Sequence, residues 1–184
     1  SLVVAEEREG ATRYRLLETV RQYGAERLRE QGELASVRQR HASYLGDLLL
    51  RCRHEAAGDH GRWIEATRAE YDNVLAALIW SRDEGTPEDQ LRLAELVWRL
   101  WWARGEFAEG REWLESALER ADDADPRLRA LALKGAAGLA WAHGDDDRAE
   151  ELAEAACALY AGSNDPEALG ALTILGHVAI NRGR

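Results

Sequence analysis

The sequence predicts an all-α protein built of stacked helical hairpins and preceded by a short β-hairpin. Three observations support this fold class. Alanine, leucine, glutamate and arginine are abundant among the 184 residues, and only three prolines interrupt them. Apolar residues recur at helical spacing through most of the chain. From residue 86 onward, prolines and glycines recur at a nearly constant interval, which is typical of repeated structural units.

The N-terminal residues predict a β-hairpin followed by a helix. Residues 1–5 (SLVVA) and 12–16 (TRYRL) are compatible with strands, and the segment between them contains Gly10. A lone two-stranded hairpin is marginally stable in water, so we expect it to pack against something else. Apolar residues at helical spacing then predict a helix over residues 16–28.

The next segment, residues 34–85, predicts a linking helical hairpin. Residues 35–53 and 62–81 each place apolar side chains at helical spacing, and glycines mark the turn between them. His41 falls on the apolar stripe of the first segment. We therefore interpret it as a core histidine.

The last segment, residues 86–184, predicts two-helix repeats. Prolines recur 39 and 40 residues apart, and glycines recur every 39 residues, at Pro87, Pro126 and Pro166 and at Gly105, Gly144 and Gly183. An apolar helical segment lies between each proline and the next glycine, and a more acidic one follows the first two glycines. Proline fits the first turn of a helix, and glycine fits the left-handed turn that ends one. The pattern predicts two complete hairpins and the first helix of a third.

The charge distribution argues against nucleic-acid binding by the repeats. The chain has a net charge of −10, and residues 86–184 carry 11 basic and 19 acidic groups. Such an acidic surface repels phosphate backbones and anionic lipids. Arginines near the start alternate with glutamates, as expected for ion pairs on a solvated helix face. We expect no membrane partner, because no apolar run approaches the roughly 18 residues of a membrane span.

No sequence pattern indicates catalysis, a metal or a cofactor. The chain has no phosphate loop of the form GxxxxGKS or GxxxxGKT, and its histidines lack the spacing of paired metal ligands. The acidic clusters at 122–126 and 144–148 fit helix N-caps better than metal sites. We therefore expect no catalytic, cofactor-binding or metal-binding residues in this chain, and no enzyme activity.

The repeat region resembles tetratricopeptide repeats. The resemblance depends on the pattern Trp98-x2-Trp101-x3-Gly105-x-Phe107-x2-Gly110-x3-Leu114-x2-Ala117, followed by a proline. The period is about five residues longer than usual, and Asp146 stands where an aromatic residue is expected. The ordered segments RYRLLETVRQYGAERL, RQRHASYL, WIEATRAEYDNVLAALIWS and LRLAELVWRLWWARGEFAEGREWLESALERA resemble bacterial STAND-type P-loop ATPases linked to LuxR-type and SARP-type transcriptional regulators.

This second resemblance implies a domain order and a function. Residues 1–33 would end a winged-helix domain, residues 34–85 would form the link, and residues 86–184 would be the repeats. ATP or ADP would bind a nucleotide-binding domain upstream of this segment in the parent protein. That domain would also be a partner of this segment. The resemblance implies a cytoplasmic regulatory module that senses a partner or inducer and controls the ATPase core. A passive scaffold or self-association module and a direct DNA-binding regulator remain alternatives.

Two tryptophans suggest where a partner would bind. Trp102 and Trp141 lie 39 residues apart, each just before a turn glycine. In tetratricopeptide arrays the first helix of each pair lines the concave surface, and the repeat register then gives a candidate groove of Arg92, Glu95, Arg99, Trp102, Lys134, Trp141, Thr173 and His177. Such a groove could bind a protein, a peptide or a small inducer. The alternative is that the indoles only cover a shallow, empty surface. We assign Trp98, Trp101 and Trp113 to packing between hairpins.

Overall fold

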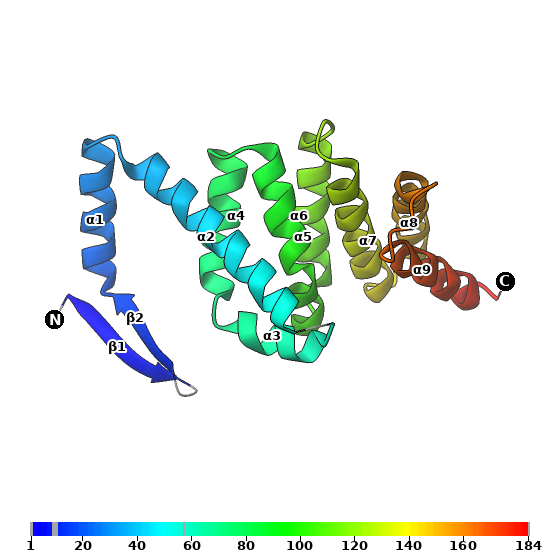
Figure 1. The fold of residues 1–184 in the computed structure, drawn as a ribbon, viewed down its shortest axis with the longest axis horizontal. Coiled ribbons are helices and arrows are strands. Elements are labelled where there is room, and N and C mark those ends of the chain that lie inside the picture. The colour runs from blue at the N-terminus through cyan, green and yellow to red at the C-terminus, as the bar shows by residue number, and fades with distance from the viewer. Residues whose placement is uncertain (1, 9–10, 57, 184) are drawn as a thin grey trace. The chain divides into compact units, whose positions relative to one another are not determined.

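The computed structural model describes residues 2–8, 11–56 and 58–183, and the chain divides into two compact units. Unit 1 comprises residues 1–40 and unit 2 comprises residues 41–184, so the division falls within helix α2 (Leu34–Glu55). Helices dominate, and the strands that the structure describes form one two-stranded sheet (Figure 1). The predicted all-α fold with a short N-terminal β-hairpin is confirmed.

Unit 1 contains the hairpin and its exit helix. Strand β1 (Val3–Arg8) pairs antiparallel with β2 (Ala11–Leu16), and Ala5 lies opposite Tyr14. Helix α1 (Glu18–Glu30) follows. Its Arg21 pairs with Glu18 at 2.6 Å, in agreement with the predicted ion pairs on a solvated face. Ser1 of the predicted first strand and Gly10 of the predicted turn lie outside the described residues. None of the described side chains of unit 1 is buried.

The first part of unit 2 differs from the sequence prediction at two points. The predicted helix over 62–81 is wrong, because α3 (His60–Arg68) and α4 (Tyr71–Asp83) are separate helices. A tight turn divides them, in which the Glu70 amide donates to the carbonyl of Thr67 at 2.9 Å. The apolar pattern continues across this turn because both helices pack on one core. His41 is exposed, so its interpretation as a core histidine is also wrong.

The repeated hairpins appear as helices α5 to α9 of unit 2. They are α5 (Pro87–Arg104), α6 (Phe107–Arg120), α7 (Pro126–Ala142), α8 (Asp146–Tyr160) and α9 (Ala168–Asn181). Their turns are equivalent in detail. The amides of Gly105 and Gly144 donate to the carbonyls of Trp102 and Trp141, and both glycines have a left-handed φ, of 73° and 85°.

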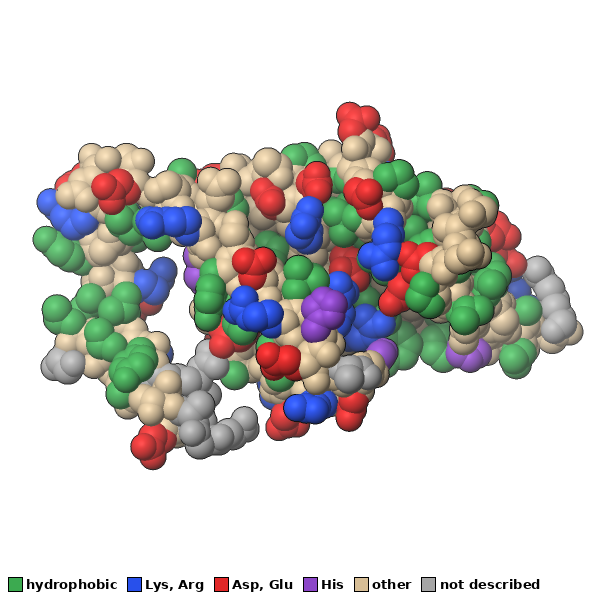
Figure 2. Space-filling model, in the orientation of Figure 1, with side chains coloured by type: hydrophobic (Ala, Val, Ile, Leu, Met, Phe, Trp, Pro, Cys, Tyr) green, Lys and Arg blue, Asp and Glu red, His purple; other side chains and the backbone are tan. Residues whose placement is uncertain are grey.

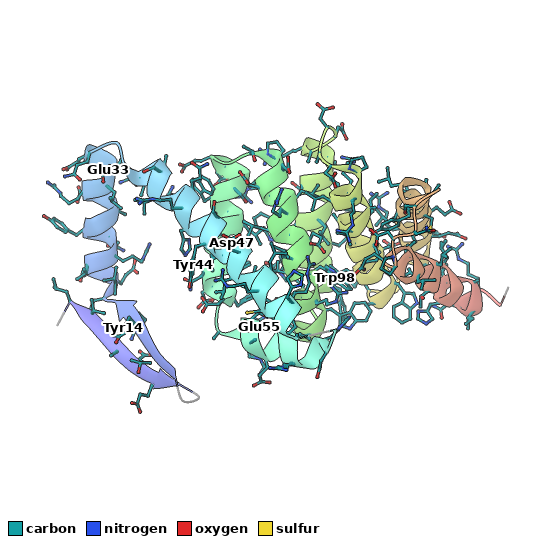
Figure 3. All side chains as sticks on the ribbon, viewed as in Figure 1. Tyr14, Glu33, Tyr44, Asp47, Glu55 and Trp98 are labelled. Carbon is teal, nitrogen blue, oxygen red and sulfur yellow. The ribbon has the colours of Figure 1, made fainter. Side chains whose placement is uncertain are left out.

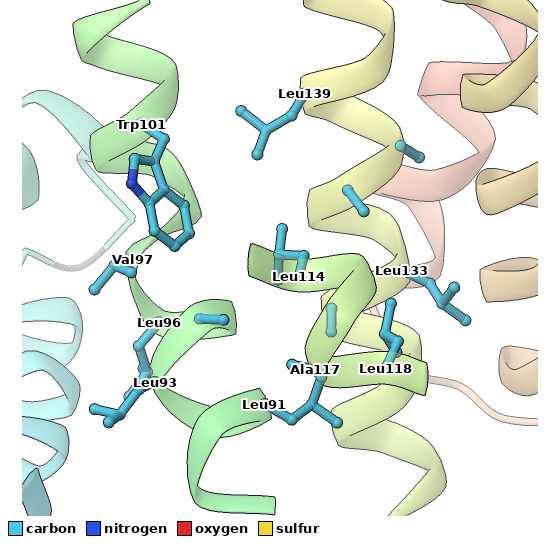
Figure 4. Packing of buried hydrophobic residues seen from close by; sticks show 14 of the residues in the cluster. Leu91, Leu93, Leu96, Val97, Trp101, Leu114, Ala117, Leu118, Leu133 and Leu139 are labelled. Carbon is cyan, nitrogen blue, oxygen red and sulfur yellow. The ribbon is translucent and has the colours of Figure 1, made fainter. Parts of the chain in front are cut away.

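The core of unit 2 runs continuously through these hairpins. Leu91 and Trp101 of α5, Leu114 of α6 and Leu139 of α7 are among its fully buried side chains (Figure 4). Burying each leucine stabilises the fold by about 1.5–3 kcal/mol relative to leaving it exposed. Helices α7 and α8, which contact each other, also contribute fully buried alanines to this core; these are Ala136, Ala140, Ala149 and Ala153.

Two aspartates from the acidic clusters cap helices, as the sequence predicts. The Asp125 carboxylate accepts a hydrogen bond from the amide of Leu128 at 3.0 Å, at the start of α7. The Asp145 carboxylate accepts one from the amide of Arg148 at the start of α8. Each therefore satisfies an amide that has no partner within its helix.

Candidate binding surface

Helices α5, α7 and α9 are the first helices of three successive hairpins, and α7 contacts both of the others. The equivalent turns at Gly105 and Gly144 each reverse the chain after a first helix, so successive hairpins fold in the same way and their first helices lie side by side. All eight residues of the predicted groove lie on these three helices. We call their shared face the inner surface.

Three of the predicted residues form a column of stacked rings across the three hairpins. The ring centroids of Trp102 and Trp141 are 5.9 Å apart with an interplanar angle of 21°. Those of Trp141 and His177 are 4.7 Å apart with an angle of 22°. His177 is exposed, and the two indoles are half-buried. The column therefore presents part of its aromatic surface to solvent at its His177 end.

A further tryptophan fixes the spacing of α5 and α7. Trp98 projects from α5 towards α7 (Figure 3), where it meets two glycines. A Cβ atom at Gly135 would lie 3.0 Å from the Trp98 ring, and one at Gly138 would lie 3.5 Å from it. The glycines leave the room that the indole needs, in agreement with the packing role that the sequence assigns to Trp98.

The inner surface also holds two ion pairs in each of which one partner is buried and the other is partly exposed. Glu95 is 3% exposed, and its carboxylate accepts from Nη1 of Arg53 at 3.1 and 3.3 Å. Lys134 is 5% exposed, and its Nζ pairs with Glu167. Glu95 and Lys134 thus lie beneath the surface rather than in an open groove. Removing one partner of such a pair leaves an uncompensated buried charge, which is strongly destabilising.

Two pockets lie on either side of the Arg53–Glu95 pair. One, with a volume of ≈ 130 Å³, has Arg99 and Lys134 in its wall. The other, with a volume of ≈ 210 Å³, has Arg92 and Leu131 in its wall. Arg53 and Glu95 line both. Figure 2 shows basic and acidic side chains interleaved on the face of unit 2 that it displays. We call the pocket of ≈ 130 Å³ the Arg99 pocket.

The remaining predicted residues have separate surroundings. Arg92 is exposed and pairs with Glu88, one helical turn earlier. The Arg99 guanidinium lies over the Trp98 ring, 4.5 Å from its centroid. Thr173 is exposed and donates its hydroxyl to the carbonyl of Leu169 in its own helix.

Sequence reasoning missed three residues that line the Arg99 pocket. Arg53 comes from α2, Trp63 from α3 and Glu167 from the turn before α9. Arg53 and Trp63 precede the repeats, so the repeat register could not place them. A signal existed for Glu167, because a lysine within an apolar helix needs an acidic partner, but the spacing does not say which carboxylate supplies it.

The described residues hold no cluster of three or more histidine, cysteine, aspartate or glutamate side chains that could bind a metal ion. Among the helices of the described segments, none combines the length and the apolar character needed to cross a bilayer.

Comparison with known proteins gives one informative result. No family model matches the sequence. Proteins of Mycobacterium bovis and of two strains of Mycobacterium tuberculosis, each named "Putative HTH-type transcriptional regulator", are 41% identical to the chain over 136 residues. The matched region covers 74% of this chain but only 15% of each relative. The chain is thus similar to one segment of much longer proteins.

Proposed function

We propose that this chain is a cytoplasmic regulatory binding module of an HTH-type transcriptional regulator. Its inner surface would bind a protein, a peptide or a small inducer. Binding would bias a nucleotide-binding domain elsewhere in the parent protein, where ATP or ADP would be held, by favouring one of its conformations. The role proposed for the chain itself is binding rather than catalysis.

The stacked column of Trp102, Trp141 and His177 is the observation that carries this proposal. Each ring comes from a different hairpin, so a ligand lying on the column would contact all three hairpins at once. Aromatic residues with partly exposed faces are common at the centres of interfaces, because they bury a large area at a small entropic cost. The similarity to HTH-type regulators supports a role in transcription.

A matched pair of histidine variants tests the proposal. His177 and His143 are both exposed, but only His177 stacks on Trp141. In the full-length protein, we expect His177→Ala to change transcription of the genes that respond to deletion of the regulator. We expect His143→Ala to leave their transcription as in the wild type. Thermal unfolding of both variants controls for loss of the fold. Equal transcription in both variants, with the fold intact, would contradict the proposal.

A passive self-association module is the second candidate, and one observation favours it. Helix α9 exposes large apolar side chains, with Leu169 68% and Ile180 72% exposed. Two copies could bury these side chains against each other. Sedimentation of the wild type and of Ile180→Glu separates the candidates, because a dimer through α9 would dissociate in the variant. We do not propose direct DNA binding by residues 86–184, whose acidic charge repels phosphate.

A further inference from the structure

The Arg99 pocket brings together three parts of unit 2. Its wall includes the end of α2 and the turn into α3, the middle of α5 and α7, and Glu167 before α9. Its volume of ≈ 130 Å³ accommodates several water molecules or a small organic ion. The pocket is distinct from the ring column, which lies at the C-terminal ends of α5 and α7.

Some charged side chains of this wall have an ion-pair partner within the described part of the chain, and Arg99 does not. Arg53 is paired with Glu95, and Lys134 is paired with Glu167. Among the described residues, Arg99 has no ion pair, and its Nε is a buried donor without an acceptor. Its guanidinium is held over Trp98 instead. Burial lowers the pKa of Arg99 below its usual value, which agrees with a cation that is poorly compensated.

A second donor in the same wall also lacks an acceptor. Trp63 is buried, and its Nε1 has no hydrogen-bond partner in the described structure. Both unsatisfied side-chain atoms of the pocket wall are therefore N–H donors. A buried donor without a partner costs roughly 1–3 kcal/mol, and a charged one more. The carboxylates of the wall already have partners, because Glu95 pairs with Arg53, Glu167 pairs with Lys134, and Asp59 accepts from the amide of Arg62. A negatively charged ligand in the pocket would supply the acceptor that Arg99 does not receive from them.

We propose that the Arg99 pocket binds the oxyanion of a small molecule, a carboxylate or a phosphate, with Arg99 as its main contact and Trp63 Nε1 as a second donor. A guanidinium presents its donors in a planar fork that matches the two oxygens of such groups. The inference rests on the proposed function, since it names the ligand class that the inner surface would sense.

Titrations with two probes test this inference. Inorganic phosphate and succinate are titrated separately into the purified protein, followed by tryptophan fluorescence and by calorimetry. We expect saturable binding of at least one probe, and the probe that binds identifies the source of the oxyanion. Arg99→Leu should weaken that binding about tenfold or more, as expected for loss of hydrogen bonds from a charged group. Arg92→Leu is the matched control, because it removes an arginine from the same helix outside this pocket.

A second variant keeps the test decisive if Arg99→Leu does not fold. Trp63→Phe keeps an aromatic ring in the core but removes the Nε1 donor together with part of the indole, and it should weaken the binding severalfold. Absence of saturable binding for both probes would overturn the inference. Equal binding in the Arg99→Leu, Trp63→Phe and Arg92→Leu variants would also overturn it, since the anion would then be held by general surface charge.

The outcomes also separate this inference from the proposed function. If a probe binds through Arg99 but both Arg99→Leu and His177→Ala leave transcription unchanged, the pocket is real and the regulatory role is wrong. If His177→Ala alters transcription but neither probe binds, the regulatory surface stands and the oxyanion pocket does not.

Discussion

At the scale of single residues, the first hairpin depends on the packing of a large tryptophan side chain against a glycine, which has no side chain. Gly110 of α6 lies against Trp101 of α5, which is fully buried. The equivalent positions of the next hairpin carry Ala149 and Ala140, both fully buried. A large residue and a glycine in one repeat thus replace two small residues in the other, which explains why the repeats share turns but not side chains.

Replacing Gly110 tests this fit. A Cβ atom at Gly110 would lie 2.7 Å from Cβ and 2.8 Å from Cδ2 of Trp101. We expect Gly110→Ala to lower the free energy of unfolding by about 1–3 kcal/mol, because overpacking outweighs the gain in helix propensity. Gly176→Ala is the control, since no heavy atom lies within 4 Å of its added Cβ. Urea denaturation measures both, and a Gly110→Ala protein as stable as the wild type would refute the fit.

At the scale of helices, capping positions set where each repeat begins. Asp125 precedes Pro126 and accepts from the amide of Leu128, so Asp125→Ala should cost about 1 kcal/mol, or about 2–4 °C in Tm. Asp125→Asn should retain most of that stability, because asparagine caps equally well. Thermal unfolding of these variants, with Asp123→Ala as an exposed neighbour that caps no helix, checks the prediction. Equal losses from Asp125→Ala and Asp123→Ala would contradict it.

Local signals explain which elements could be predicted. Proline and glycine act within a few residues of themselves, so the hairpins after residue 86 and their turns follow from the sequence. No proline or glycine marks the turn at Ala69–Glu70, and the helical spacing of apolar residues continues through it, so one helix was predicted where there are two. The pairing of Trp102 with Trp141 could be predicted because the repeat register relates them. The same register leads from Trp141 to Ile180, so the stacking of His177 could not be predicted. The Arg53–Glu95 pair spans 42 residues and depends on packing that no repeat describes.

At the scale of the whole molecule, neighbouring hairpins of unit 2 are connected by ion pairs in addition to the apolar core. Arg111 of α6 pairs with Asp145 before α8 at 2.5 Å, and Arg148 of α8 pairs with Glu115 of α6 at 3.1 Å. Lys134 and Glu167 join the second hairpin to the third in the same way. Because these contacts cross from one repeat to the next, their loss should weaken the cooperativity of the stack as well as its stability.

Acid should therefore destabilise the protein. The hydrogen bond from Arg111 lowers the pKa of Asp145 below its usual 3.8. Burial opposes ionisation of Glu167, but the hydrogen bond and charge of Lys134 outweigh it, so its pKa also lies below the usual 4.5. The unfolded state then binds more protons than the folded state in acid, so the free energy of unfolding decreases as the pH decreases. The stability from these groups is complete above the usual values and is lost as the pH drops through the lowered ones.

Urea denaturation from pH 7 to pH 3.5 measures this dependence directly. We expect the free energy of unfolding to fall most steeply below pH 4.5, where Glu167 and then Asp145 begin to protonate in the unfolded state. Asp145→Asn and Arg111→Met remove the same ion pair from opposite ends, so each should flatten the acid limb by a similar amount. If the two variants kept the slope of the wild type, ion pairs between hairpins would not be what acid disrupts, and the apolar core alone would hold the stack together.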